Sequence, residues 1–233
     1  MNTEETLAHV RIPVGRVVLE ADVVVPPQAV GVVLFAHGSG SGRHSPRNRY
    51  VAGELQRDGL ATVLADLLTE QEERADAVTA HLRFDIGLLA DRLTALTSWV
   101  GGYQPTAGLG VGLFGASTGA AAALITAAGQ QSAVRAVVSR GGRPDLAGEH
   151  LRLVRQPTLL IVGGLDTVVI ELNQRAFTQL VGQKELVIVP GATHLFSEPG
   201  TLEQVARLAR SWFTRHLSAS AQGSTTSGAN DWH

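Results

Sequence analysis

The sequence contains no cysteine, and aromatic residues make up only 5% of its 233 residues. The absence of cysteine excludes disulfides, thiolate metal ligands and a cysteine nucleophile. No apolar run approaches the roughly 18 residues that a membrane-spanning helix needs. The first residues, MNTEETLAHVRIP, lack the basic, apolar and small-residue order of a secretory signal. We therefore expect a soluble, cytoplasmic protein.

The composition has no strong bias of charge either. The formal net charge is -2, so we expect neither nucleic acid nor an anionic membrane as a partner. Hydrophobic residues make up 44% and charged residues 17%, as in ordinary globular proteins. The length suits one domain, which we place at residues 1–217. Residues 218–233 are rich in Ser, Gly and Ala and are predicted to form a disordered tail. The oligomeric state stays open.

Short β-branched segments alternate with longer helical patterns along the chain, which predicts an α/β fold. Its sheet should be mostly parallel with helices on both faces, because segments such as Val30–Ala36 are apolar almost throughout. Two strands around Gly15, at 9–14 and 16–25, should form an opening antiparallel hairpin. Residues 69–74 are expected to be a charged loop, and 144–154 a short helix or turn. The other expected strands are 60–65, 109–114, 134–139, 158–162 and 185–189, and the expected helices are 46–58, 76–100, 118–128, 168–181 and 201–217.

Two of these helices carry start signals. Ser45 followed by Pro46 is typical of an N-cap with proline at the first helical position. Thr201 and Gln204 have the spacing of a capping box. Both signals predict where a helix begins.

The segment LGVGLFGASTG, residues 109–119, carries the clearest chemical signal. An apolar strand runs into Gly115-Ala116-Ser117-Thr118-Gly119 and then into an alanine-rich helix. A nucleophile on a sharp strand-to-helix turn has strained backbone angles, and side chains two positions away on either side would collide with nearby backbone. The helix that follows points its N-terminus at developing negative charge. We therefore expect Ser117 to be a catalytic nucleophile; the plain alternative is a glycine-rich packing turn.

A serine nucleophile needs a base and an acid that orients the base. Asp166 follows the strand at 158–162, and His194 follows the last strand, so the chain order is Ser, Asp, His. Asp166 as a helix cap and His194 as a surface histidine are the non-catalytic alternatives. Glu171 and His150 are the fallback acid and base.

These segments together resemble the α/β-hydrolase superfamily, and within it the small lidless proteins similar to dienelactone hydrolase. The resemblance covers about Arg11 to Leu217 and rests on LFAHGSGSGRHSPRN, GLFGASTGA, PTLLIVGGLDTVV and VPGATHLF. It implies the α/β-hydrolase fold and no cap domain. Dienelactone hydrolases proper resemble cysteine enzymes at the nucleophile position. Because this chain has Ser117 there, we expect a serine esterase rather than an enzyme that cleaves dienelactone.

The same fold implies where the oxyanion hole lies. One donor should be the N–H of Thr118, directly after the nucleophile. The other should come from the HGSGSG loop, where the N–H of Ser39 is the first choice and that of Gly40 the second. His37 is expected to brace this loop rather than transfer protons. The alternative for the loop is a flexible linker.

The region after the strand at 134–139 bears on the substrate. The stretch 140–156 is too short to hold a cap, so the cleft should be open. Arg140 or Arg143 lies at the carboxyl end of a strand and would suit an acidic substrate; an exposed arginine, or a turn partner of Asp145, is the alternative. The basic residues Arg43, His44 and Arg47 add positive potential near the oxyanion loop.

The combined prediction is a serine hydrolase that cleaves a carboxylic ester or similar small acyl substrate through an acyl-enzyme on Ser117. The three side chains complete the chemistry, so neither metal nor cofactor is expected. A peptidase or acyltransferase that uses the same triad remains an alternative. So does a non-catalytic binding domain that keeps the fold.

Overall fold

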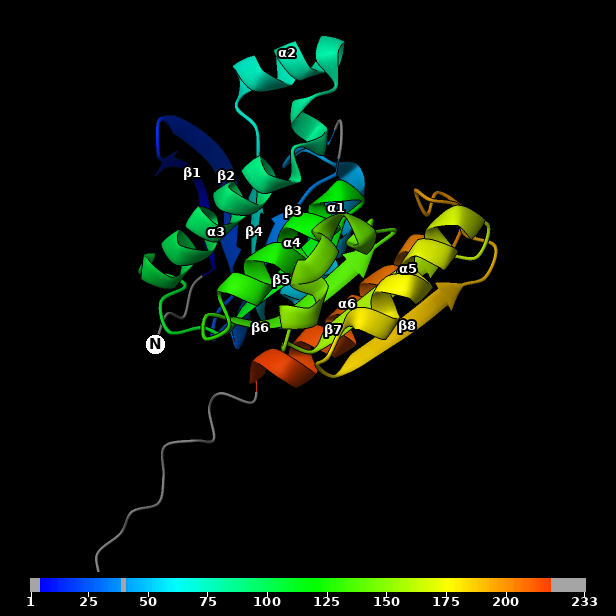
Figure 1. The fold of residues 1–233 in the computed structure, drawn as a ribbon. Coiled ribbons are helices and arrows are strands. Elements are labelled where there is room, and N and C mark those ends of the chain that lie inside the picture. Colours follow the sequence, from blue (N-terminus) through cyan, green and yellow to red (C-terminus); the bar gives the residue numbers. More distant parts are fainter. Residues whose placement is uncertain (1–4, 39–40, 219–233) are drawn as a thin grey trace, which may run out of the picture.

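A computed structural model describes residues 5–38 and 41–218 of the chain. Its centre is an eight-stranded sheet in the order β1-β2-β4-β3-β5-β6-β7-β8 (Figure 1). The strands are β1 (Thr6–Val14), β2 (Val17–Val25), β3 (Gly31–Ala36), β4 (Leu60–Ala65), β5 (Val111–Ala116), β6 (Val134–Arg140), β7 (Thr158–Gly163) and β8 (Lys184–Val189). The helices are α1 (Pro46–Arg57), α2 (Glu70–Thr79), α3 (Ile86–Gly102), α4 (Thr118–Gly129), α5 (Thr167–Gln179) and α6 (Thr201–Leu217), with short 3-10 segments η1 (Leu82–Phe84) and η2 (Pro144–Leu153).

The sheet has an antiparallel beginning and a parallel remainder, as predicted. β1 pairs antiparallel with β2 across the turn at Gly15, whose φ of +57° suits glycine. β2 then pairs antiparallel with β4, and all later pairs are parallel. The carboxyl ends of β3 to β8 therefore share one edge, where residues that follow different strands can meet.

Helices cover both faces of the sheet (Figure 1). Side chains from α3, α4 and α5 pack on one face, and Leu93, Leu96 and Leu124 are completely buried there. On the other face lie α1 and α6, whose Leu55 and Phe213 are also completely buried. This arrangement confirms the predicted α/β layers and explains why the central strands are apolar on both sides.

Most boundaries agree with the prediction to within three residues, but one region differs. The segment expected as a charged loop begins helix α2, because Thr69 and Glu72 form a complete capping box. The single helix expected over 76–100 is two helices. Ala80 ends α2 in the left-handed conformation with φ 55°, and Asp85 caps α3 by accepting a hydrogen bond from the N–H of Leu88.

The capping box predicted for the last helix is also wrong. The N-cap of α6 is Gly200, in the left-handed conformation, and Thr201 is already helical. The hydroxyl of Thr201 instead donates to the carbonyl of Glu198 at 2.7 Å. The cap of α1 agrees with the prediction, since Ser45 accepts a hydrogen bond from the N–H of Asn48.

Two further predictions concern membrane-spanning helices and the C-terminal tail. Across the described ranges, no helix has both the length and the apolar character to cross a membrane. The tail predicted at 218–233 lies, except for Ser218, outside the described residues.

Candidate active site

Ser117 occupies the sharp turn between β5 and α4. Its backbone has φ 50° and ψ −122°, a strained conformation for a residue with a side chain. Such strain persists only where the surroundings enforce it. Here the N–H of Ser117 donates to the carbonyl of Arg140 at 3.3 Å, and its carbonyl accepts from the N–H of Arg143 at 3.0 Å. The end of β6 thus holds the turn from both sides.

The glycines on either side of Ser117 are required by close backbone approaches. A Cβ at Gly115 would lie 2.4 Å from the Cα of Ala120. A Cβ at Gly119 would lie 2.2 Å from the carbonyl oxygen of Ala36 in β3. Both distances are far below van der Waals contact, so the Gly-x-Ser-x-Gly pattern has the steric cause expected from the sequence.

Asp166 and His194 come together at the same edge of the sheet. The Nδ1 atom of His194 lies 2.6 Å from Oδ2 of Asp166, within hydrogen-bond distance. Close packing brings their loops together: a Cβ at Gly163 would lie 2.5 Å from the carbonyl oxygen of Ala192. The N–H of Leu165 also donates to that carbonyl at 2.9 Å. Asp166 is the N-cap residue of α5, but its side chain makes no capping hydrogen bond.

Ser117 and His194 lie on either side of the end of β6. Ser117 is bonded to Arg140, as described above, and the next residue, Gly141, faces the histidine. A Cβ at Gly141 would lie 3.6 Å from Cε1 of the His194 imidazole. The structure therefore gathers the three predicted catalytic residues around one strand end. The fallback residues have other neighbours: Glu171 pairs with Arg175 along α5, and Nδ1 of His150 lies 3.1 Å from the Ala147 carbonyl.

The predicted oxyanion hole is described in part. Thr118 is buried and begins α4, so its N–H lies at the positive end of that helix. Gly38 packs directly against Ser117, since a Cβ there would lie 2.7 Å from the Cβ of Ser117. Ser39 and Gly40 lie outside the described residues.

His37 braces the beginning of this loop with both ring nitrogens. Nδ1 lies 3.1 Å from the carbonyl oxygen of Gly38, to which it donates. Nε2 accepts from the N–H of Leu67 at 2.8 Å. Burial lowers the pKa of His37, which keeps the ring neutral in this arrangement. The geometry agrees with the predicted role as a brace.

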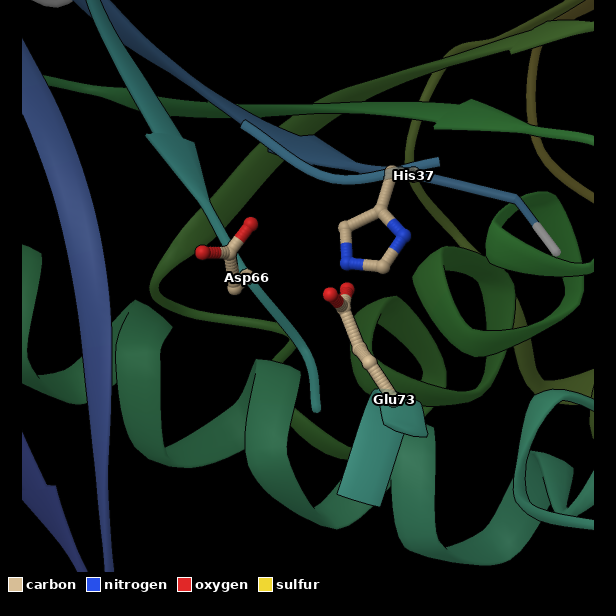
Figure 2. A group of neighbouring side chains, drawn as sticks. All are labelled: His37, Asp66 and Glu73. Atoms are coloured by element: carbon tan, nitrogen blue, oxygen red, sulfur yellow. The ribbon is translucent and has the colours of Figure 1, made fainter. Parts of the chain in front are cut away.

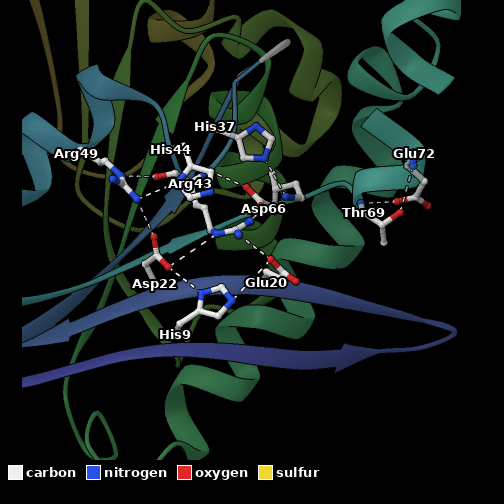
Figure 3. Close-up of polar contacts among 11 residues, drawn as sticks. His9, Glu20, Asp22, His37, Arg43, His44, Arg49, Asp66, Thr69 and Glu72 are labelled. Atoms are coloured by element: carbon white, nitrogen blue, oxygen red, sulfur yellow. Dashed lines mark hydrogen bonds and ion pairs between the residues drawn. The ribbon is translucent and has the colours of Figure 1, made fainter. Parts of the chain in front are cut away.

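Arg43 anchors the other end of the loop (Figure 3). Its backbone N–H donates to Oδ1 of Asp66 at 2.7 Å, and its guanidinium pairs with Oδ2 of the same carboxylate. The guanidinium also pairs with Glu20 at 2.6 Å and lies 3.8 Å from Asp22. From its sequence, Arg43 was expected only to add positive potential near the oxyanion loop. Its acidic partners lie on β2 and after β4, so no local pattern could have paired them.

A cavity of about 600 Å³ opens beside Thr118 and Gly38. Helix α2, which stands away from the sheet in Figure 1, contributes to its wall. This part of the cavity wall was not predicted, because the start of α2 was expected to be a loop. The lining carries more carboxyl groups than guanidinium groups: Glu20, Asp66, Glu70, Glu73 and Asp76 against Arg43 and Arg83, with the two histidines His37 and His44.

One group in this cavity has the residue types of a metal site. Single ligand atoms of His37, Asp66 and Glu73 lie within 4.8 Å of one another (Figure 2). However, Nε2 of His37 already accepts a backbone N–H, and both Asp66 oxygens hold Arg43. Desolvation, followed by the charge of Asp66, raises the pKa of Glu73 and so favours its protonated form. Metal ligands must be deprotonated and have a free lone pair, so this group fits a metal ion poorly.

The two arginines suggested as substrate contacts have different surroundings. The guanidinium of Arg143 is held by both carboxylate oxygens of Asp145, at 2.9 and 2.8 Å. That pairing corresponds to the turn-partner alternative. Arg140 is buried, and its Nε and Nη1 have no hydrogen-bond partner in the described ranges.

The mostly parallel, helix-covered sheet, with a strained serine turn, a histidine and a carboxylate at its carboxyl edge, is that of an α/β hydrolase. Comparisons with known proteins identify the family. Residues 19–218 match the model of the dienelactone hydrolase family, and the chain belongs to that family. It is 57% identical to a dienelactone hydrolase from Anabaena variabilis, with a TM-score of 0.90, covering 91% of this chain and 99% of that one. The predicted resemblance and fold class are thereby confirmed.

Two other relatives extend the comparison. Est1E from Butyrivibrio proteoclasticus has a TM-score of 0.75 at 15% identity, over 89% of this chain and 98% of that one, a likeness of fold alone. A Mycobacterium tuberculosis protein provisionally named as a phosphoribosyl transferase is 59% identical over 209 residues. These residues are 90% of this chain and 46% of the relative, so the chain spans about half the length of the curated relatives that it matches.

Proposed function

We propose that the protein is a serine hydrolase that cleaves a carboxylic ester, or a similar small acyl substrate, through an acyl-enzyme on Ser117. The observation that carries the proposal is the 2.6 Å contact between His194 and Asp166 at the edge where Ser117 stands on its strained turn. Membership of a hydrolase family supports it independently. The cavity beside Thr118 is of a size that suits a small-molecule substrate.

The mechanism assigns one role to each side chain. With Nδ1–H of His194 donating to Asp166, the other ring nitrogen is free to accept the proton of the Ser117 hydroxyl. The Ser117 oxygen then attacks the ester carbonyl. Its charge moves to the carbonyl oxygen, where the N–H of Thr118 and a donor of the loop after β3 stabilise it, with Ser39 proposed first and Gly40 second.

Collapse of this intermediate expels the alcohol, which takes the proton from His194. Water then takes the place of the alcohol. His194 removes a proton from the water, the hydroxide adds to the acyl carbon, and the Ser117 oxygen leaves and takes the proton back from His194. None of these steps needs a metal or cofactor.

A fluorophosphonate label and 4-nitrophenyl acetate test this proposal. We expect wild-type protein to react with both reagents. Ser117→Ala should abolish labelling and reduce turnover by up to about 10⁶-fold. Asp166→Asn should reduce turnover by about 10⁴-fold, because the imidazole is held in the wrong tautomer. Ser98→Ala is the matched control, since Ser98 lies exposed on α3 and bonds only to the Thr94 carbonyl.

The alternatives give different results in the same assay. Wild-type protein that reacts with neither reagent would indicate a binding domain that keeps the fold. Faster product formation when a second alcohol or amine is added would indicate an acyltransferase, and cleavage of peptide amides would indicate a peptidase. The transferase name of the Mycobacterium tuberculosis relatives belongs to a protein of about twice the length, and nothing in the Ser117 geometry favours phosphoribosyl transfer.

A further inference from the structure

The end of β6 carries a buried positive charge for which the described residues offer no counterion. Arg140 exposes only 8% of its surface, and its Nε and Nη1 atoms find no partner among the described residues. Nε of Arg47 is buried and unpartnered in the same way. Arg92, the other buried arginine of the described chain, is instead bound by both oxygens of Glu72. One buried arginine, Arg92, is thus neutralised by a carboxylate, whereas Arg140 has no such partner among the described residues.

Arg140 lies directly beside the proposed catalytic residues. It is the sheet neighbour of Ala116, and its carbonyl holds the N–H of Ser117. The side chain before it, Ser139, points toward α4, because Ser139 and Ala120 would both collide with a Cβ at Gly142. Side chains alternate along a strand. The side chain of Arg140 therefore starts from the opposite face of the sheet, where α1 and α6 pack.

Arg47 belongs to a helix that packs on that face. It belongs to the first turn of α1, where the helix end adds partial positive charge. Burial first, and then the charge of Arg47, lowers the pKa of Arg140 to about 10, so Arg140 remains charged at neutral pH. Arg140 and Arg47 are thus near each other, and neither forms an ion pair with a carboxylate of the described residues. Burying an unpaired charge is costly, and such violations are expected where function requires them.

We propose that Arg140 and Arg47 bind a phosphate group of the substrate, so that the ester cleaved at Ser117 is one whose acyl or alcohol part carries a phosphate monoester. A phosphate dianion balances both guanidinium charges, whereas a carboxylate balances only one. Guanidinium N–H groups also match the geometry of phosphate oxygens. The phosphate is a recognition group and takes no part in bond breaking. The inference rests on the proposed ester hydrolysis.

The cavity on the other side favours this placement. Its lining is acidic, and the two arginines among the described lining residues are already paired with carboxylates, Arg43 with Glu20 and Arg83 with Asp76. A phosphate would be repelled there. The charge distribution therefore directs an anionic group toward Arg140 and leaves the cavity for the uncharged part of the substrate.

The first test measures binding without catalysis. Inorganic phosphate at saturating concentration, compared with chloride at equal ionic strength, should raise the Tm of the wild type by about 2–4 °C. Arg140→Met and Arg47→Met should remove most of this rise. Arg152→Met, which deletes an exposed arginine paired with Glu149, is the matched control and should keep it. No rise in the wild type, or an equal rise in Arg140→Met, would overturn the proposal; the latter would mean an adventitious ion only.

The second test measures stability without phosphate. Arg140→Met should raise the Tm by about 3 °C, because it removes an uncompensated buried charge. Arg92→Met should lower the Tm, because it leaves the Glu72 carboxylate without its partner. A clear fall of the Tm in Arg140→Met would mean that Arg140 has a structural partner, and would contradict its assignment to a ligand.

The third test links binding to the reaction. We would compare 4-nitrophenyl esters of 3-phosphonopropanoic, succinic and butyric acid above the second pKa of the phosphonate. The wild type should prefer the phosphonate by at least about tenfold in kcat/KM over the other two, and Arg140→Met should abolish the preference. A preference for the succinate, or one that survives in Arg140→Met, would overturn the proposal. If all esters are inert while phosphate still stabilises the wild type through Arg140, ester hydrolysis fails and the anion site stands.

Discussion

At the scale of single residues, the site depends on positions that have no side chain. Gly38, Gly115 and Gly119 allow β3, β5 and α4 to approach so closely that Ser117 is forced into its strained turn. His37 works in the same direction, because it ties the loop after β3 to the backbone at Leu67. Ser117 is therefore positioned by backbone packing together with the hydrogen bonds that its own N–H and carbonyl make with Arg140 and Arg143.

Adding a single methyl group at Gly119 should therefore affect both stability and the reactivity of Ser117. Gly119→Ala should lower the free energy of unfolding by about 3 kcal/mol and slow fluorophosphonate labelling of Ser117, because the new Cβ has no space beside the Ala36 carbonyl. Gly129→Ala, at the other end of α4, is the control, since no atom outside the local helix lies within 4 Å of its Cβ position. It should leave labelling unchanged and stabilise the protein by up to about 1 kcal/mol. Equal labelling rates in both variants would contradict this explanation.

At the scale of elements, α2 differs most from the expectation and forms part of the cavity wall. Its connection to the rest of the molecule depends on Glu72, which completes the capping box and binds Arg92 of α3. The hydrogen bond from Arg92, with help from Thr69, lowers the pKa of Glu72 to about 2. The wall of the cavity is thus held by an ion pair that acid can break.

The sign of the pH dependence follows from the lowered pKa. The Glu72 interaction is fully present above the ordinary pKa of 4.5 and is lost as the pH falls toward 2. Because a quarter of the Glu72 side chain is exposed, we discount its value to about 1–2 kcal/mol. Glu72→Gln should lose this amount at pH 7 and show a weaker fall of unfolding free energy between pH 4.5 and 2, measured by urea denaturation.

Glu70→Gln provides the comparison for that experiment. Its partner is Arg74, and both side chains are largely exposed. The change should alter the unfolding free energy by less than about 0.5 kcal/mol. An equal loss of unfolding free energy in both variants would mean that the Glu72–Arg92 pair stabilises the protein no more than the exposed Glu70–Arg74 pair does.

At the scale of the whole molecule, the sheet is closed on one face by the last helix. Trp212, Phe213 and Leu217 of α6 are almost completely buried. Gly31 and Gly112 make room for them, because a Cβ at either glycine would lie 2.6 Å from a side-chain atom of Leu217 or Phe213. The last helix is therefore part of the core.

Shortening the chain tests this role. A chain that ends at Ser218 should keep the Tm and esterase activity of the full chain, since all of α6 is retained. A chain that ends at Arg210 loses the three buried side chains, each worth about 2 kcal/mol. This loss is comparable to the whole stability of a typical domain, so the shorter chain should be unfolded by circular dichroism. A folded chain ending at Arg210 would contradict the assignment of α6 to the core.

Much of the fold was predictable because its causes are local. β4 and α6 have the predicted bounds, and the other strand ends differ by at most three residues. Apolar runs of strand length and proline or serine caps act within a few neighbouring residues. The break between α2 and α3 was missed because neither glycine nor proline marks it; the left-handed residue is Ala80, which has no such preference in a sequence.

The sequence by itself determined the candidate chemistry: a serine between two glycines, an acid and a histidine after successive strands, and the order in which they occur. Steric crowding at the turn and the shared edge of parallel strands make those positions readable along the chain. Only the tertiary structure decided which charges are neutralised. Arg43 pairs with carboxylates of distant strands, whereas Arg140 has no such partner among the described residues. That outcome depends on which side chains the packing of strands and helices brings within a few ångströms.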